Sequence, residues 1–187
     1  MGLNEQELIR RSKQGDKSSM EALYRSHLDD AVRLAYMITR NWATAEDAVQ
    51  EAFIQAFRSI GTFHEGKPFK PWLAKIVVNK SRRIGAKFNA PWDELDYQQA
   101  DSSDDGSPEK RFLQEEERHR LAQAINLLRE KHRLPLILKY LSDLSEAETA
   151  DVLGIPVSTV KSRLYVARKQ LAEKLKIIEG GEQRGEA

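Results

Sequence analysis

The segment SEAETADVLGIPVSTVKSRLYVARKQLAEKL, residues 145–175, decides the fold of the last third of this chain. Ser145 can begin a short helix that ends near Leu153, and Gly154-Ile155-Pro156 then forms a turn. A second helix follows, whose apolar residues recur at helical spacing. These are Val160, Leu164, Ala167, Leu171 and Leu175. A short helix, a tight turn with glycine and a second helix predict a helix-turn-helix, whose second helix enters the major groove of DNA.

The outer face of that second helix carries hydroxyl and cationic side chains. Between residues 158 and 176 six residues are basic, and Glu173 is the one acidic residue. Hydroxyls and cations can bond base edges and phosphates, so this face is a candidate DNA contact. Its residues are Ser158, Thr159, Lys161, Ser162, Arg163, Tyr165 and Arg168, with Lys169 beside them. A plain αα-hairpin that binds no DNA fits the same helical pattern.

The rest of the chain also has helical periodicity and essentially no strand alternation. A helix is expected after residue 18, where Ser18 and Glu21 match a capping box. A second helix is expected to begin at Thr44, which can cap it, and to end at Gly61. A third begins near Pro71, and apolar runs at 121–128 and 135–141 predict two more. We therefore expect an all-α protein.

Charge divides the 187 residues into blocks. Residues 1–88 hold 15 basic and 10 acidic residues, residues 89–118 hold 3 and 10, and residues 119–187 hold 12 and 9. Two basic blocks around an acidic segment suggest two polyanion-binding domains joined by a tether. We predict two small helical domains, 1–88 and 112–179, an acidic flexible linker at 89–111 and a flexible tail at 180–187.

Several classes of function are not expected. The chain has no Cys, which excludes disulfides, zinc-thiolate sites and thiol catalysis. The four His residues are scattered, so no metal site is expected. No phosphate-binding glycine loop and no pairing of nucleophile with base is visible, so neither an enzyme nor a cofactor is expected. No run of about 18 apolar residues and no signal peptide is present, so we expect a cytoplasmic protein without membrane insertion.

Two further helix faces are charged. The helix after Thr44 carries Glu46, Asp47, Gln50, Glu51 and Gln55 opposite its apolar stripe. The third helix presents Lys75, Asn79 and Arg82 on a common face, within a stretch of seven basic residues and no acid between 67 and 87. The acidic face taken alone fits a solvated surface, and the aromatic residues near Trp72 fit a core as well as a base platform.

Three stretches together resemble the signature regions of extracytoplasmic-function sigma factors. They are TAEDAVQEAFIQAFRSI (44–60), PFKPWLAKIVVNKSRR (68–83) and LSEAETADVLGIPVSTVKSRLYVARKQLAEKL (144–175), and they stand in the family's order and separation. The resemblance implies an initiation factor that binds core RNA polymerase, directs it to promoter DNA and opens that DNA, without catalysis of its own. It also implies that an anti-sigma factor holds the protein inactive.

The resemblance assigns a role to each charged face. Asp47, Gln50 and Glu51 resemble the surface that docks on the polymerase clamp helices, and an anionic face suits a basic partner. The segment 61–72 resembles the loop and helix start that receive a flipped base of the minus-ten element. The residues that resemble the minus-ten contacts are Phe63, Phe69, Trp72, Lys75, Asn79, Arg82 and Arg83. The residues listed above on the outer face of the second helix of the helix-turn-helix resemble the minus-thirty-five contacts. The three aromatic residues can stack on an unpaired base or pack in the core.

Two positions depart from the family pattern. Arg83 stands where Asp is common, and Val166 stands where Arg is common, so the preferred promoter sequence does not follow from the resemblance. Two other functions fit parts of the chain. A helix-turn-helix regulator without polymerase docking would use only the C-terminal half, and a helical interaction adaptor would show no salt-dependent affinity for DNA.

Overall fold

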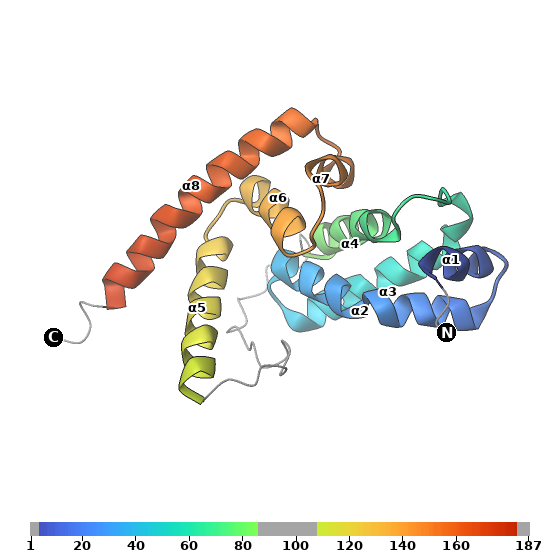
Figure 1. Ribbon diagram of the computed structural model, residues 1–187, viewed down its shortest axis with the longest axis horizontal. Helices are drawn as coiled ribbons and strands as arrows, with labels where there is room; N and C mark the ends of the chain where they lie inside the picture. Colours follow the sequence, from blue (N-terminus) through green and yellow to red (C-terminus); the bar gives the residue numbers. More distant parts are fainter. Residues whose placement is uncertain (1–3, 86–107, 183–187) are drawn as a thin grey trace.

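The computed structural model describes residues 4–85 and 108–182. Within these ranges the chain is helical and has no strand, which confirms the predicted all-α class. The elements are α1 (Glu5–Lys13), α2 (Lys17–Thr39), α3 (Trp42–Arg58), the short 3-10 helix η1 (Ile60–Thr62), α4 (Phe69–Gly85), α5 (Pro108–Asn126), α6 (Glu130–Tyr140), α7 (Glu146–Leu153) and α8 (Val157–Glu182), drawn in Figure 1. None of the described helices is long and apolar enough to cross a membrane.

The N-terminal half is a bundle of α2, α3 and α4, with α1 packed on α2 (Figure 1). Each helix buries one apolar stripe, as its spacing predicts. In α3 the buried residues are Ala45, Ala48, Val49, Ala52, Phe53 and Ala56, and in α4 they include Phe69, Leu73, Val77 and Ile84. The small alanines of α3 let its backbone approach its neighbours closely, so the charged outer faces of α3 and α4 are fixed beside each other.

The helix starts differ from the predicted ones. The N-cap of α2 is Asp16, which accepts hydrogen bonds from the Ser18 N–H and the Ser19 hydroxyl, so the predicted capping box at Ser18 is wrong. The N-cap of α3 is Asn41 instead of Thr44, whose N–H and hydroxyl both donate to the Asn41 Oδ1 at 2.8 Å. An Asx residue just upstream supplies a better-placed acceptor in each case.

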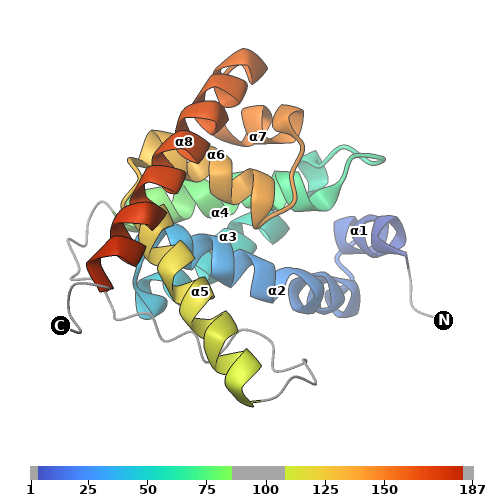
Figure 2. The same cartoon turned by 60° about the vertical axis from the view of Figure 1, so that its left-hand side comes forward.

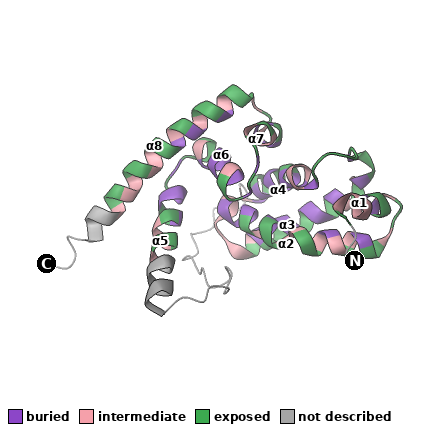
Figure 3. Cartoon of the chain, in the orientation of Figure 1, coloured by how far each residue is buried: buried purple, intermediate pink, exposed green. Residues whose placement is uncertain are grey.

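The C-terminal half consists of α5 to α8, and the predicted helix-turn-helix is α7, its turn and α8. Ser145 and Glu148 form a complete capping box at the start of α7. Gly154 ends α7 in the left-handed region, at φ 64°, which glycine adopts at little cost. Val152 of α7 and Val160 and Leu164 of α8 are buried, and Figure 3 colours the helices by burial.

The two halves lie in direct contact. Helix α4 packs against α7 (Figure 2) and α2 against α6. The buried side chains of both halves form one continuous cluster. Residues 108–111 of the predicted linker begin α5, and α8 extends to Glu182, into the predicted tail. The rest of the predicted linker, from 89 to 107, and residues 183–187 lie outside the described residues.

Candidate nucleic-acid interface

The outer face of α8 presents the polar residues that the sequence places there. Ser158, Lys161, Ser162, Tyr165 and Arg168 are exposed, and Tyr165 is 68% exposed although it is a large aromatic residue. Thr159 and Arg163 are partly covered. The opposite side of the helix buries Val160, Leu164 and Ala167, so the core fixes the direction in which the polar face points.

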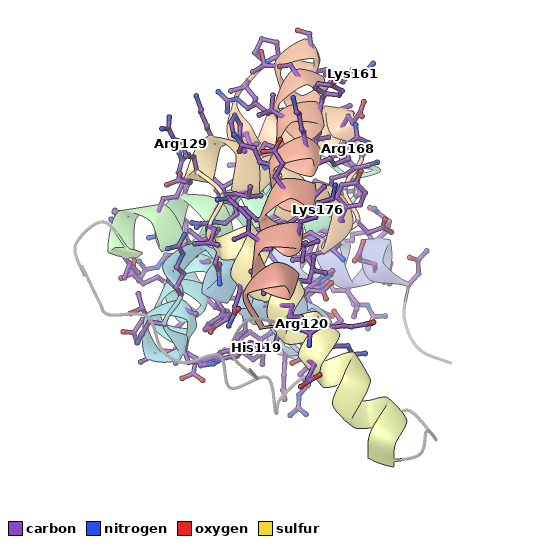
Figure 4. All side chains as sticks on the ribbon, turned by 90° about the vertical axis from the view of Figure 1, so that its left-hand side faces the viewer. His119, Arg120, Arg129, Lys161, Arg168 and Lys176 are labelled. Atoms are coloured by element: carbon purple, nitrogen blue, oxygen red, sulfur yellow. The ribbon has the colours of Figure 1, made fainter. Side chains whose placement is uncertain are left out.

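Cations follow one another along α8. Figure 4 shows Lys161, Arg168 and Lys176 spaced down this helix, with Arg129 apart from them at the start of α6. Within the protein, Lys161 is near one carboxylate, Glu146 of α7, with 3.9 Å between Nζ and Oε2. At that distance and exposure the pair holds the cation weakly, so Lys161 remains able to reach a phosphate.

The outer face of α4 carries the second predicted set. Lys75, Asn79, Arg82 and Arg83 are all exposed. Two of the four are engaged in ion pairs. Arg82 Nε lies 2.7 Å from Glu130 Oε1 of the C-terminal half, and Arg83 Nη2 lies 2.6 Å from Glu51 Oε2 of α3. Lys75 and Asn79 are therefore the members of this set whose side chains have no polar contact within the described residues.

Of the three aromatic residues predicted as minus-ten contacts, two are buried and one is partly exposed. Phe63 is 3% and Phe69 0% exposed, and their ring centroids lie 5.7 Å apart in an edge contact. Trp72 contacts both rings, at 5.2 and 5.5 Å, but is only partly buried. Of the two roles that the sequence left open, Phe63 and Phe69 pack in the core. Trp72 is the one of the three with surface available to a ligand.

The acidic face of α3 is exposed as predicted. Asp47, Gln50 and Glu51 all lie at the surface. Glu51 is not a free carboxylate, because it accepts hydrogen bonds from Lys80 at 3.1 Å and Arg83 at 2.6 Å. These contacts lower the pKa of Glu51, with the hydrogen bond from Lys80 as the largest cause. The sequence assigned Glu51 and Arg83 to two different surfaces, and the structure joins them.

A groove beside this face was not expected from the sequence. It has a volume of about 330 Å³ and lies between α2 and α3. Its apolar lining includes Leu28, Val32, Trp42 and Val49, and its polar lining includes Tyr24, Asp29, Arg33, Glu46 and Gln50. The spacing of Leu28 from Val32 and of Asp29 from Arg33, four residues in each case, is the signal that could have pointed to it.

Comparison with known proteins gives a consistent result. Residues 23–84 match the family model described as Sigma-70 region 2, and residues 118–171 match Sigma-70, region 4. The chain is 30% identical to the RNA polymerase sigma-H factor of Pseudomonas aeruginosa, over 91% of this chain and 93% of that protein. It is 32% identical to the ECF RNA polymerase sigma factor SigW of Bacillus subtilis, over 90% and 95%.

Solved structures share the fold. CnrH, in complex with the cytosolic domain of CnrY, superimposes with a TM-score of 0.71 at 22% identity, covering 92% of this chain and 97% of that one. The sigma factor RpoE of Bartonella quintana, in complex with the anti-sigma factor NepR, gives 0.63 at 24% identity, covering 84% and 96%. In both cases the similarity is in the arrangement of the helices.

Proposed function

Because the chain belongs to the extracytoplasmic-function sigma factors, we propose that it binds core RNA polymerase, recognises promoter DNA and promotes the opening of that DNA. The observation that carries the proposal is the match to regions 2 and 4, in the family's order, on two helical halves. Each half presents a charged outer face with an apolar stripe behind it. A helix-turn-helix regulator without polymerase docking would leave α1 to α4 without a role.

The three exposed faces differ in charge, and each charge suits a different partner. Asp47 and Gln50 on α3 suit a basic helical surface of the polymerase, and they would repel the phosphates of DNA. Lys75 and Asn79 on α4, with Trp72, suit the unpaired bases and backbone of the minus-ten element, where stacking and cations both contribute. The exposed face of α8 suits the minus-thirty-five element, read as a duplex through the major groove.

The protein is also proposed to act in the cytoplasm and to be held inactive by an anti-sigma factor. Two proteins of the same fold were solved as complexes, RpoE of Bartonella quintana with the anti-sigma factor NepR and CnrH with the cytosolic domain of CnrY. In this chain the groove between α2 and α3 borders the proposed polymerase face. A partner seated there would compete with the polymerase for Asp47 and Gln50.

The decisive experiment is in vitro transcription with purified core polymerase and a library of promoter fragments, followed by sequencing of the transcript starts. We expect transcripts that require both the core enzyme and this protein and that share two sequence elements upstream of the start. A second sigma factor serves as the control for active core. Absence of transcripts, with that control active and this protein folded, would reject the proposal.

The opening step has its own test. Lys75→Ala with Asn79→Ala removes one cation and one amide from α4 and leaves its two ion-paired arginines intact. Permanganate reactivity of thymines near the start should fall on a fully paired promoter and largely recover on a premelted one, because capturing bases must offset a few kcal/mol of unstacking. Equal defects on both templates would assign these residues to binding or folding.

A further inference from the structure

The segment between η1 and α4, residues 63–68, is the part of the proposed minus-ten region with the least support of its own. Apart from Phe63, its residues are exposed. One backbone hydrogen bond closes it, from the Lys67 N–H to the His64 carbonyl at 3.3 Å, and Gly66 stands in the left-handed region at φ 82°. A loop of this kind does not keep one conformation unless other parts of the molecule hold it.

Gln6 of α1 provides that support. Its Nε2 donates to the Lys67 carbonyl at 3.0 Å, and its Oε1 accepts from the Gly66 N–H at 3.2 Å. One side-chain amide thus satisfies a donor and an acceptor on two adjacent residues of the loop. Figure 1 shows α1 beside the turn that leads from η1 into α4. A second attachment joins Lys13 Nζ to Glu65 Oε1 at 3.0 Å.

Helix α1 is itself firmly placed. Ile9 is fully buried, and Glu5 Oε1 lies 2.9 Å from His27 Nε2 of α2. His27 in turn contacts the ring of Phe69, with centroids 5.2 Å apart, at the first residue of α4. Gln6 therefore reaches the loop from an element that is packed on the bundle and that is connected through His27 to the start of α4.

We propose that Gln6 is a positioning residue for base recognition: by clamping the backbone at Gly66 and Lys67 it sets the shape of the loop that receives an unpaired minus-ten base. The inference rests on the proposed function, because it takes the loop as the base-receiving segment. A clamped loop presents one arrangement of hydrogen-bonding groups to a base, and it therefore distinguishes one base from another. A loop released from Gln6 samples several arrangements and discriminates less.

The Lys13–Glu65 pair cannot replace this clamp. The Lys13 side chain is 21% exposed, but its partner Glu65 is 57% exposed. Exposed pairs of this kind are weak and are screened by salt. The Gln6 amide bonds the loop backbone directly, and its two hydrogen bonds do not depend on the charges of Lys13 and Glu65. Its effect should accordingly persist at high salt.

The test uses the holoenzyme formed with core polymerase and forked promoter DNA, with each of the four bases placed in turn at each unpaired minus-ten position. The quantity measured is the dissociation constant for the most weakly bound base divided by that for the most tightly bound base at the same position. Gln6→Ala should reduce this ratio at one position by about five- to tenfold, the loss expected from two hydrogen bonds. Binding to the upstream duplex element should not change.

Gln14→Ala is the matched control. Gln14 is exposed at the C-cap of the same helix, and no side-chain hydrogen bond of it is described, so the same change should leave the ratio unaltered. Gln6→Glu keeps the acceptor for the Gly66 N–H but turns a carboxylate toward the Lys67 carbonyl. It should also reduce the ratio, and it replaces Gln6→Ala in the test if Gln6→Ala does not fold.

The outcomes separate the two proposals. If the parent holoenzyme discriminates between bases and Gln6→Ala retains the full ratio, the positioning role is rejected and the proposed function stands. If Gln6→Ala weakens binding of all four bases equally, Gln6 serves stability alone and the role is again rejected. If the parent itself discriminates at no minus-ten position, the base-receiving function of the loop is rejected, and the inference with it.

Discussion

At the scale of single residues, Arg133 is a buried cation with unsatisfied hydrogen-bond donors. It lies in α6 at 5% exposure, and its Nε and Nη1 have no hydrogen-bond partner. A buried donor without a partner loses its hydration and gains nothing in return, which costs about 1–3 kcal/mol. Its aliphatic stem is nevertheless buried in α6, a helix in which Leu134 and Leu136 are also buried. Arg133 thus contributes volume to the core and a penalty from its charged end.

Arg133→Met keeps an unbranched stem and removes the guanidinium. We expect the free energy of unfolding, measured by urea titration, to rise by about 1–3 kcal/mol. Arg129→Met, at the exposed N-cap of the same helix, should change it by less than about 0.5 kcal/mol. A clear loss of stability in Arg133→Met would mean that the guanidinium makes a favourable interaction in solution.

A second residue-scale effect concerns acid. Hydrogen bonds from Arg10 and then Arg11 lower the pKa of Glu7 from 4.5 to about 2. The folded state thus favours the carboxylate over the acid. This contribution to stability is fully present above pH 4.5 and is lost as the pH falls through about 2.

Glu7→Gln removes the group that titrates. The parent should melt at a higher temperature than this variant near pH 6, and the difference should shrink toward zero as the pH is lowered to about 2, because the protonated acid no longer pairs with the arginines. Thermal melts followed by circular dichroism over this range measure the difference. A constant difference at all pH values would contradict the pairing of Glu7.

At the scale of elements, α3 and α8 follow the same plan. One side of each helix is apolar and buried, and the other side is polar and exposed. The buried side sets the direction of the exposed side, so substitutions on the exposed side can alter binding with little effect on stability. The two exposed sides differ in charge, which predicts different partners and different dependence on salt.

For α3, Asp47→Lys with Gln50→Lys should weaken binding to core polymerase by at least about tenfold, since it places cations against a basic partner. The melting temperature should stay close to that of the parent. Glu51 is left unchanged, because its bonds to Lys80 and Arg83 link α3 to α4. Competition against the parent for core measures the loss. Glu173→Lys, which raises the charge by two on α8 against three in the α3 pair, is the control, and similar losses in both would contradict a specific docking face.

For α8, Lys161→Ala and Arg168→Ala should each weaken binding to the upstream element and lower the salt slope by about one unit if each meets one phosphate. Ser162→Ala and Tyr165→Ala should instead alter the preference among sequences. Titrations over a range of salt concentrations separate the two effects. Lys17→Ala, an exposed cation on α2, should change neither. If all four α8 variants matched the parent, the recognition face would be elsewhere.

At the scale of the whole molecule, the two halves are packed together by α4 on α7 and α2 on α6. Arg40 Nη2 donates to the Asn126 carbonyl at 2.8 Å, and Arg82 pairs with Glu130. Successive turns of DNA are about 34 Å apart, so two elements about two turns apart lie on the order of 70 Å from each other. We expect the halves to separate when the protein binds both elements, and Arg82 then to leave Glu130.

Glu130→Gln removes one interdomain attachment. Because the chain has no native cysteine, Gln14→Cys and Glu173→Cys allow a dye pair to report the separation of the halves. Glu130→Gln should increase the extended population of the free protein by about two- to fivefold, the effect of one exposed ion pair. Glu117→Gln, on an exposed residue of α5, should leave it unchanged. A complex with core polymerase and promoter that kept the packed distance would contradict the need for separation.

Much of this protein follows from local sequence alone. Helical spacing of apolar residues determines which side of α3, α4 and α8 is buried, and so the exposure of Asp47, Lys75 and Tyr165 could be predicted. Turn chemistry determines the helix-turn-helix, because Ser145 and Gly154 act on residues within one turn of themselves. These features depend on neighbours along the chain, and a sequence displays its neighbours directly.

Only the tertiary structure decided which distant groups meet. Packing brings Gln6 to a loop some 60 residues away, Glu51 to Arg83, and Arg82 to Glu130 of the other half. It also buries Phe63 and Phe69, which the sequence left open as base contacts. The physical reason is that the spacing of residues along one helix says which side is covered but not what covers it. The partner of each polar group is fixed when the helices pack against one another.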